Sequence, residues 1–227
     1  MKYIVFSLSL VTLSANALQL NSVSTFIEPT DKSVAVEAIN SDKTKAHLFS
    51  VSVSKIKSPY TMETDGSGPS DEMTYTPSKM IVPAGKSINV RFFYNGPSDD
   101  KERYYKIDWT DVTFTAKGNG MAAKKAEVTA RANLATVLVV RPRNINYAYS
   151  YADGLLRNTG NSTLRVVASG TCAKENDKKD SSPCSVRTNL TPGKSTIFNK
   201  LKQNKELRIG VWEGKMFVPV SIEQVRE

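Results

Sequence analysis

A two-residue alternation of apolar and polar side chains is the feature that most constrains the fold of this chain. It is clearest where Phe49, Val51 and Val53 alternate with three serines. Such a pattern places one face of a strand against a core and the other face in water. No segment shows a long apolar period of 3.6 residues, so the sequence predicts an all-β protein. In the first part of the chain the expected strands are 33–40, 49–54, 87–94, 105–109 and 128–140.

The spacing of the turn signals predicts two domains. Short strands separated by Pro- and Gly-containing turns are typical of sandwiches. Pro142 ends one set of strands, because proline cannot donate to a sheet ladder. We therefore expect one immunoglobulin-like sandwich over 18–141 and a second over 142–227. Strands are expected in the second domain at 147–151, 155–157, 164–169, 195–198, 207–212 and 216–222.

The N-terminal segment, residues 1–17, is predicted to be a signal peptide. Lys2 precedes an apolar run of about eleven residues, and Ala15 and Ala17 form an A-x-A cleavage signal. A retained N-terminal anchor is the alternative, but the run is too short to span a bilayer. Of the 227 residues, loss of the first 17 leaves 210, and loss of Lys2 lowers the net charge from +9 to +8. The product is expected to be exported and soluble.

The two cysteines are predicted to form a disulfide. Cys172 and Cys184 have 11 residues between them, and paired cysteines are usual in oxidising compartments. Closing a loop of this size stabilises a fold by about 3 kcal/mol in the chain-entropy model. A redox-active pair is the alternative, and the C-x-x-C spacing typical of one is absent.

Composition argues against catalysis, cofactors and metals. A zinc site of Cys and His ligands would consume His47, which is the only histidine, and both cysteines. A Ser/His/Asp triad would also depend on His47, and the glycine-rich stretches lack phosphate-loop spacing. No spacing nominates the paired carboxylates of a hydrolase. The positive charge suggests binding to nucleic acid or to an anionic surface, but export and scattered lysines argue against nucleic acid. A basic surface that suits acidic partners, or that serves solubility alone, is the alternative. We expect a binding protein that is not an enzyme.

The longest expected strand, 128–140, suggests a binding edge. Its even positions carry a row of small and medium apolar residues, and a polar, glycine-containing stretch precedes it. Unprotected strand edges are normally avoided because they invite pairing. A protein that keeps one can use it to bind another chain by strand addition. An ordinary final strand of a sandwich is the alternative interpretation.

Five blocks of sequence, in this order, resemble the periplasmic fimbrial (pilus) chaperones, and most closely the branch that serves common-pilus-type fimbriae. The blocks are YTPSKMIVPAG (75–85), VRFFYNGP (90–97), DKERYYKI (100–107), ATVLVVRPR (135–143) and LRNTGNSTLR (156–165). No single block is decisive, but their order and spacing make the resemblance specific.

The resemblance implies a two-domain, L-shaped periplasmic chaperone that binds pilus subunits and adhesin by donor-strand complementation. Such chaperones lend their last N-domain strand to subunits that lack one, and deliver them to an outer-membrane usher for fimbrial assembly. The same edge could also pair with a second copy of the chain. A fimbrial subunit or adhesin with immunoglobulin-like domains is the alternative, but the region 18–26 is too short and too polar for a donor extension.

The resemblance also assigns residues. The donor row falls on Val128, Ala130, Ala132 and Leu134. Arg91 and Glu102 match a pair thought to fix the angle between the domains, with a surface ion pair as the alternative. The lysine that helps to hold the subunit's terminal carboxylate in a better-known branch falls on Val137, and residues 20–27 contain no basic residue. Arg131 and Arg141 are therefore the candidates for that anchor, unless each is only a solvated charge.

Overall fold

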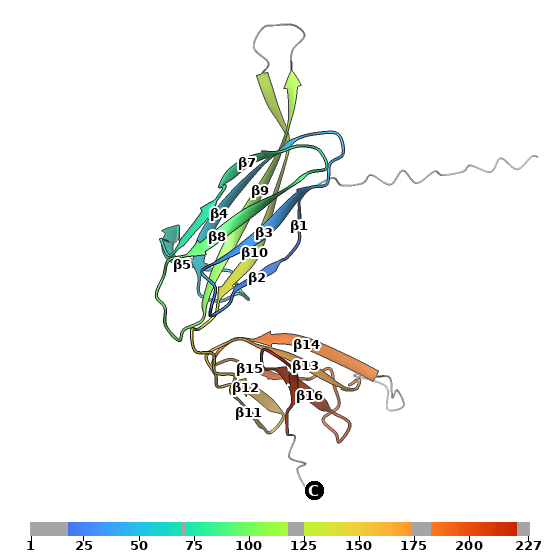
Figure 1. Ribbon diagram of the computed structural model, residues 1–227. Coiled ribbons are helices and arrows are strands. Elements are labelled where there is room, and N and C mark those ends of the chain that lie inside the picture. The colour runs from blue at the N-terminus through green and yellow to red at the C-terminus, as the bar shows by residue number, and fades with distance from the viewer. Residues whose placement is uncertain (1–17, 70, 118–124, 174–182, 222–227) are drawn as a thin grey trace, which may run out of the picture.

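The computed structural model describes residues 18–69, 71–117, 125–173 and 183–221, which form strands and their connections without a helix. The predicted all-β class is confirmed. Two β-sandwich bodies follow one another along the chain and meet at an angle, which gives the molecule its L shape (Figure 1). The predicted signal peptide, residues 1–17, lies outside the described residues. Nothing in the described ranges forms a helix that could cross a membrane.

The first body is a sandwich of two sheets. The four-stranded sheet has the order β1 (Leu18–Leu20), β3 (Ser33–Asn40), β8 (Ser87–Tyr94), β6 (Met73–Thr76). The six-stranded sheet has the order β2 (Ser24–Ile27), β10 (Lys125–Val140), β9 (Arg103–Lys117), β4 (His47–Ile56), β5 (Thr64–Pro69), and β7 (Lys79–Val82) also pairs with β4. Pairing is antiparallel except between β2 and β10, which run parallel.

The alternating residues of the central strands form the core between these sheets. Tyr105, Ile107 and Trp109 on β9 are fully buried, as the sequence pattern predicts. Phe92 on β8 meets Trp109 edge to face across the two sheets, with ring centroids 6.2 Å apart. Aromatic contacts of this kind add to the burial of apolar area, which stabilises the fold by about 25 cal/mol per Å².

The second body is a smaller sandwich with its own core. One sheet has the order β11 (Tyr149–Ala152), β12 (Leu155–Asn158), β15 (Ser195–Ile197), and the other β14 (Pro183–Leu190), β13 (Leu164–Thr171), β16 (Arg208–Trp212), β17 (Phe217–Pro219). Leu156, Leu164 and Val211 are fully buried between them. The division predicted between residues 141 and 142 falls in the connection from β10 to β11.

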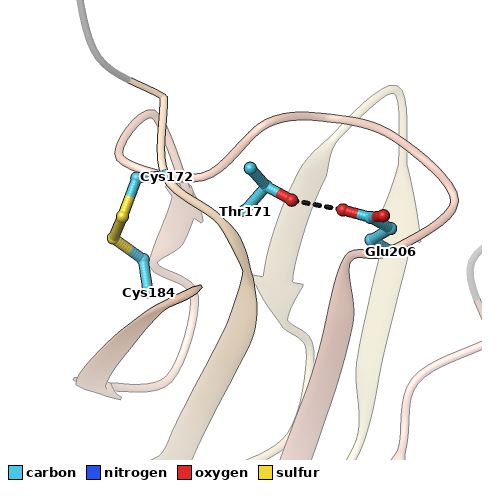
Figure 2. Close-up of a disulfide and its surroundings, with 4 residues drawn as sticks. All are labelled: Thr171, Cys172, Cys184 and Glu206. Carbon is cyan, nitrogen blue, oxygen red and sulfur yellow. Dashed lines mark hydrogen bonds between the residues drawn. A yellow bond between two sulfur atoms is a disulfide. The ribbon is translucent and has the colours of Figure 1, made fainter. Parts of the chain in front are cut away.

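The predicted disulfide is present in this second body. Cys172, which follows β13, is bonded to Cys184 on β14, and their Cα atoms are 5.1 Å apart (Figure 2). Beside it, the Thr171 hydroxyl donates a hydrogen bond to the Glu206 carboxylate. The disulfide therefore ties together two adjacent strands of one sheet.

Candidate functional site

Strand β10 has one edge that is only partly paired. Its other edge joins β9 along the whole described length of the strand, and the described ends of β9 and β10 project beyond their sheet (Figure 1). On the free side, β2 pairs only with Val137–Val140. Within the described residues no strand pairs with this side of β10 at residues 130–135. We call this side of residues 130–135 the open edge.

The backbone of the open edge presents hydrogen-bonding groups that no strand of the described residues pairs with. The N–H groups of Val137 and Arg141 donate to carbonyls of the β2 segment, at 3.1 Å each. Because backbone groups alternate between the two sides of a strand, the N–H and C=O groups of Arg131, Asn133 and Ala135 point toward that same side. They are positioned to bond an added strand that would run as a continuation of β2.

Side chains on one face of β10 change from buried to exposed where the pairing with β2 ends. Leu138 is fully buried and Thr136 is 4% exposed, whereas Leu134 is 42% exposed. The buried indole of Trp109 donates to the Thr136 hydroxyl at 3.0 Å, which marks the boundary. Ala132 and Ala130 continue the exposed row. An added strand would be flanked by an apolar row that the molecule itself leaves uncovered.

The predicted four-residue row is interrupted at its far end. A register shift between Val128 and Ala130 places an extra residue in β10 opposite β9. Such a bulge breaks the two-residue alternation, so Val128 does not share the face of Ala130, Ala132 and Leu134. Val128 is 63% exposed. The continuous row therefore consists of three residues, and the sequence contains no signal that would have revealed the bulge.

The two arginines proposed as carboxylate anchors lie in different surroundings. Arg131 is exposed on the open edge and lies on the opposite face from the apolar row. Arg141 lies where the two domains meet, with its guanidinium 4.7 Å from the centre of the Phe26 ring. Its Nε is 3.2 Å from Glu28 Oε1, and its Nη1 donates to Ser162 Oγ at 3.1 Å and to Tyr147 at 3.3 Å. Arg141 is thus occupied by bonds within the molecule.

Arg91 and Glu102 form no ion pair among the described residues, and the Glu102 carboxylate is bound by the second domain. Its carboxylate accepts hydrogen bonds from the Thr163 N–H at 2.8 Å, the Ser162 hydroxyl at 2.9 Å and the Thr163 hydroxyl. Arg91 is exposed on β8. Glu102 therefore joins the two domains through hydroxyl and backbone donors of Ser162 and Thr163.

The segment before β9 also ties the first domain to the connection. Asp99 forms a bidentate pair with Arg103, with N–O distances of 2.6 and 2.7 Å, and this pair holds the pKa of Asp99 well below its usual range. The Asp99 carbonyl accepts from the Arg143 N–H at 2.9 Å. Asp100 accepts from the Asn144 N–H and side-chain amide, also at 2.9 Å. The connection that follows β10 is therefore fixed by hydrogen bonds to the segment before β9, whereas the open edge of β10 has no strand partner in the described residues.

The chemistry available here is that of strand pairing. The described residues contain no group of three or more His, Cys, Asp or Glu placed to hold a metal ion.

Sequence reasoning missed the split of the first strand into β1 and β2, which belong to different sheets. That split sets where the open edge begins. The short β-branched and aromatic run at 24–27 is the only sequence signal for β2, and it does not reveal the parallel partner.

Comparisons with known proteins agree with this arrangement. The family model described as the EcpB C-terminal domain matches residues 147–220. A protein of Klebsiella pneumoniae (strain 342), named probable fimbrial chaperone EcpB, is 38% identical over 91% of this chain and 92% of its own length. The protein of the same name from Escherichia coli (strain K12 / DH10B) is 37% identical over the same shares.

A solved structure shares the fold at much lower sequence identity. The structure described as Salmonella enterica SafA pilin in complex with the SafB chaperone matches at 13% identity and a TM-score of 0.53. The match covers 88% of this chain and 91% of the other.

Proposed function

The chain belongs to the EcpB family of fimbrial chaperones, and from this premise we propose that it holds pilus subunits by donating strand β10 to them. The open edge is the observation that carries the proposal: residues 130–135 lack a strand partner on one side within the described residues, and Ala130, Ala132 and Leu134 lie exposed in a row beside it. An unfinished subunit would gain ladder hydrogen bonds from the backbone and apolar burial from the row.

The site of action proposed for the protein is the periplasm, and its action there is non-enzymatic. The A-x-A signal at residues 15–17 and the disulfide between Cys172 and Cys184 support an exported protein. The proposed partners are fimbrial subunits and adhesin, followed by an outer-membrane usher that receives them. The SafA–SafB complex supports the subunit as partner, since a chaperone of the same fold is bound there to a pilin.

The structure favours a donor row of Ala130, Ala132 and Leu134, with Leu134 as its largest member. Two alanines bury little apolar area, so we infer that the backbone ladder contributes more of the binding than the side chains do. Arg141 is proposed to stabilise the domain junction, because its guanidinium is already bound by Glu28 and Ser162. Arg131 remains the candidate for a contact with the client.

The experiment that tests strand donation removes one outward-facing N–H group. Asn133→Pro deletes a donor on the open side and leaves the bonds from β10 to β9 in place, as proline is tolerated at such edge positions. Asn133→Ala is the matched control, since it removes the same side chain and keeps the N–H group. Each variant is coexpressed in the periplasm with a fimbrial subunit that the parent protein captures, and the complex is purified.

We expect Asn133→Ala to capture the subunit and Asn133→Pro to lose capture, while both have the circular dichroism of the parent protein. Equal capture by two folded variants would contradict strand donation. Size-exclusion chromatography of the client-free protein shows whether the same edge is used for self-association.

A further inference from the structure

A buried charged cluster lies behind the open edge. Asp111 on β9 is 3% exposed and is paired in the ladder with Ala132 of the donor row. Its Oδ1 atom is 2.7 Å from His47 Nδ1. Its Oδ2 atom accepts a hydrogen bond from the backbone nitrogen of Leu18, at 3.1 Å. Leu18 is the first residue of β1 in the opposite sheet, so this contact spans the interior of the sandwich.

A second carboxylate lies on the other side of the imidazole. His47 is 1% exposed, and its Nε2 atom is 3.4 Å from Asp42 Oδ2 and 3.4 Å from the Thr113 hydroxyl. Backbone and hydroxyl hydrogen bonds from Thr44, together with the Lys45 N–H, hold the pKa of Asp42 well below its usual range. Asp42 is therefore a carboxylate at neutral pH.

The cluster contains two carboxyl groups and one imidazole, so it has room for a second positive charge. His47 supplies at most one, whatever its protonation, against the carboxylates of Asp42 and Asp111. In the described part of the chain no lysine or arginine lies within salt-bridge distance of either. A further positive charge beside a buried carboxylate stabilises its charged form. The remaining partner of Asp111 is the Leu18 nitrogen, which directly follows the predicted cleavage signal, Ala15 to Ala17.

We propose that removal of residues 1–17 turns the Leu18 nitrogen into an α-ammonium group that pairs with Asp111 inside the first domain. Hydrolysis adds water across the Ala17–Leu18 peptide bond. The released peptide keeps the carboxylate, and the new amine of Leu18 takes up a proton. A neutral N–H donor to Asp111 thereby becomes a charged one, which adds the attraction of an ion pair to a hydrogen bond that already has a carboxylate as its acceptor.

Processing of the chain would then complete the fold. The α-ammonium fixes the start of β1 against β9, next to Ala132, and adds a positive charge to the cluster of Asp42, His47 and Asp111. This role does not depend on subunit binding, so its failure would leave the proposed function unaffected.

The first test compares two chains that differ by one native residue. One begins at Leu18, and the other keeps Ala17, so that the Leu18 nitrogen is an amide and the ammonium is displaced by one residue. We expect the folded-to-unfolded ratio, from urea unfolding at pH 7, to be at least about tenfold higher for the chain that begins at Leu18. The same ratio in both chains would overturn the proposal, and so would an exported protein whose first residue by mass spectrometry is not Leu18.

The second test measures the charge directly and needs no variant that could misfold. The pKa of the Leu18 α-amino group, followed by NMR in protein labelled with ¹³C-leucine, is expected at about 9 or above, compared with about 7.7–8.0 for an ordinary terminus. A raised pKa stabilises the fold below the unfolded value, and this contribution is lost as the pH rises through the folded value. The advantage of the chain that begins at Leu18 should therefore shrink between about pH 8 and pH 10. An ordinary pKa would overturn the proposal.

Asp111→Asn provides the matched background. In chains that carry it, retention of Ala17 should change the urea midpoint little, because the countercharge is gone. If retention of Ala17 lowered the urea midpoint as much in the Asp111→Asn background as in the parent background, the drop would come from steric crowding, and the proposed ion pair would be overturned.

Discussion

The two halves of strand β10 differ in how they are closed. From Val137 to Val140 the strand pairs with β9 on one side and β2 on the other, and these four residues are all buried. At residues 130–135 the pairing with β9 continues, but the other side has no strand partner within the described residues, and the side chains are exposed. Both halves belong to one strand of one sheet.

This difference shows that closure is set by the neighbouring strand and not by β10 itself. β2 contains only four residues, Ser24–Ile27, and the chain upstream of it belongs to the other sheet as β1. The closed half contributes to the core, and the half beyond β2 is left for a partner. A strand anchored at one end in its own core can offer the other end without losing its place in the fold.

Leu134→Asp is expected to have the largest effect on the open half. A charge at this position would be buried without a partner in a bound subunit, and the leucine burial would be lost as well. We expect subunit capture to fall by at least about 100-fold, while the urea midpoint changes little because Leu134 is exposed in the free protein. Undiminished capture by a folded Leu134→Asp protein would show that the row does not enter the subunit.

Leu138→Ala tests the closed half, Val137–Val140, by its effect on stability and not on subunit capture. Leu138 is fully buried on the same face as Leu134, so truncation should lower the free energy of unfolding by about 2–5 kcal/mol. Leu134→Ala is the matched control and should cost well under half as much stability. Comparable losses of stability in urea unfolding would mean that the two halves are equally packed in the free protein.

Thr136→Val tests the boundary between the halves. The Trp109 indole N–H donates to the Thr136 hydroxyl in the interior, and loss of that hydroxyl leaves a buried donor unsatisfied, at about 1–3 kcal/mol in unfolding experiments. Trp109→Phe removes the donor and part of the indole packing. Its loss of unfolding free energy should be smaller in the Thr136→Val background than in the parent protein, because the hydrogen bond is already absent there. Equal costs in the two backgrounds would show that the bond contributes nothing.

Val128→Asp should have the smallest effect on subunit capture, and it tests whether the donor row extends to Val128. The bulge between Val128 and Ala130 removes Val128 from the face of the donor row. We expect capture to fall only a few-fold, far less than with Leu134→Asp. If Val128→Asp and Leu134→Asp reduced capture equally in pull-downs, Val128 would belong to the donor row.

The alternation of side chains was sufficient to predict much of the fold. The strands around Val51, Val90 and Ile107 follow their apolar period, and their inward residues are buried as expected. β14 was missed, because its inward residues such as Cys184 and Val186 are only half-buried and the strand begins at Pro183. Where burial is partial, the pattern weakens and a strand is hard to recognise.

The candidate site was predictable in place but not in detail. The long strand with small apolar residues suggested an edge, and the family resemblance placed Glu102 at the domain junction. The partner of Glu102 was not predictable, because Ser162 and Thr163 meet Glu102 only through the tertiary fold and the block that contains them does not indicate this contact. The bulge at Val128 and the contact of Leu18 with Asp111 likewise depend on the register of the strands.

Amide hydrogen exchange along β10, measured residue by residue by NMR, tests strand donation most directly. In the monomeric, client-free protein we predict fast exchange at Arg131, Asn133 and Ala135, and slow exchange at Val137 and Val139, whose N–H groups face β2. Addition of a fimbrial subunit should protect the first three amides. Protection of those amides in the free monomer, or continued fast exchange in the complex, would contradict the donation of this strand.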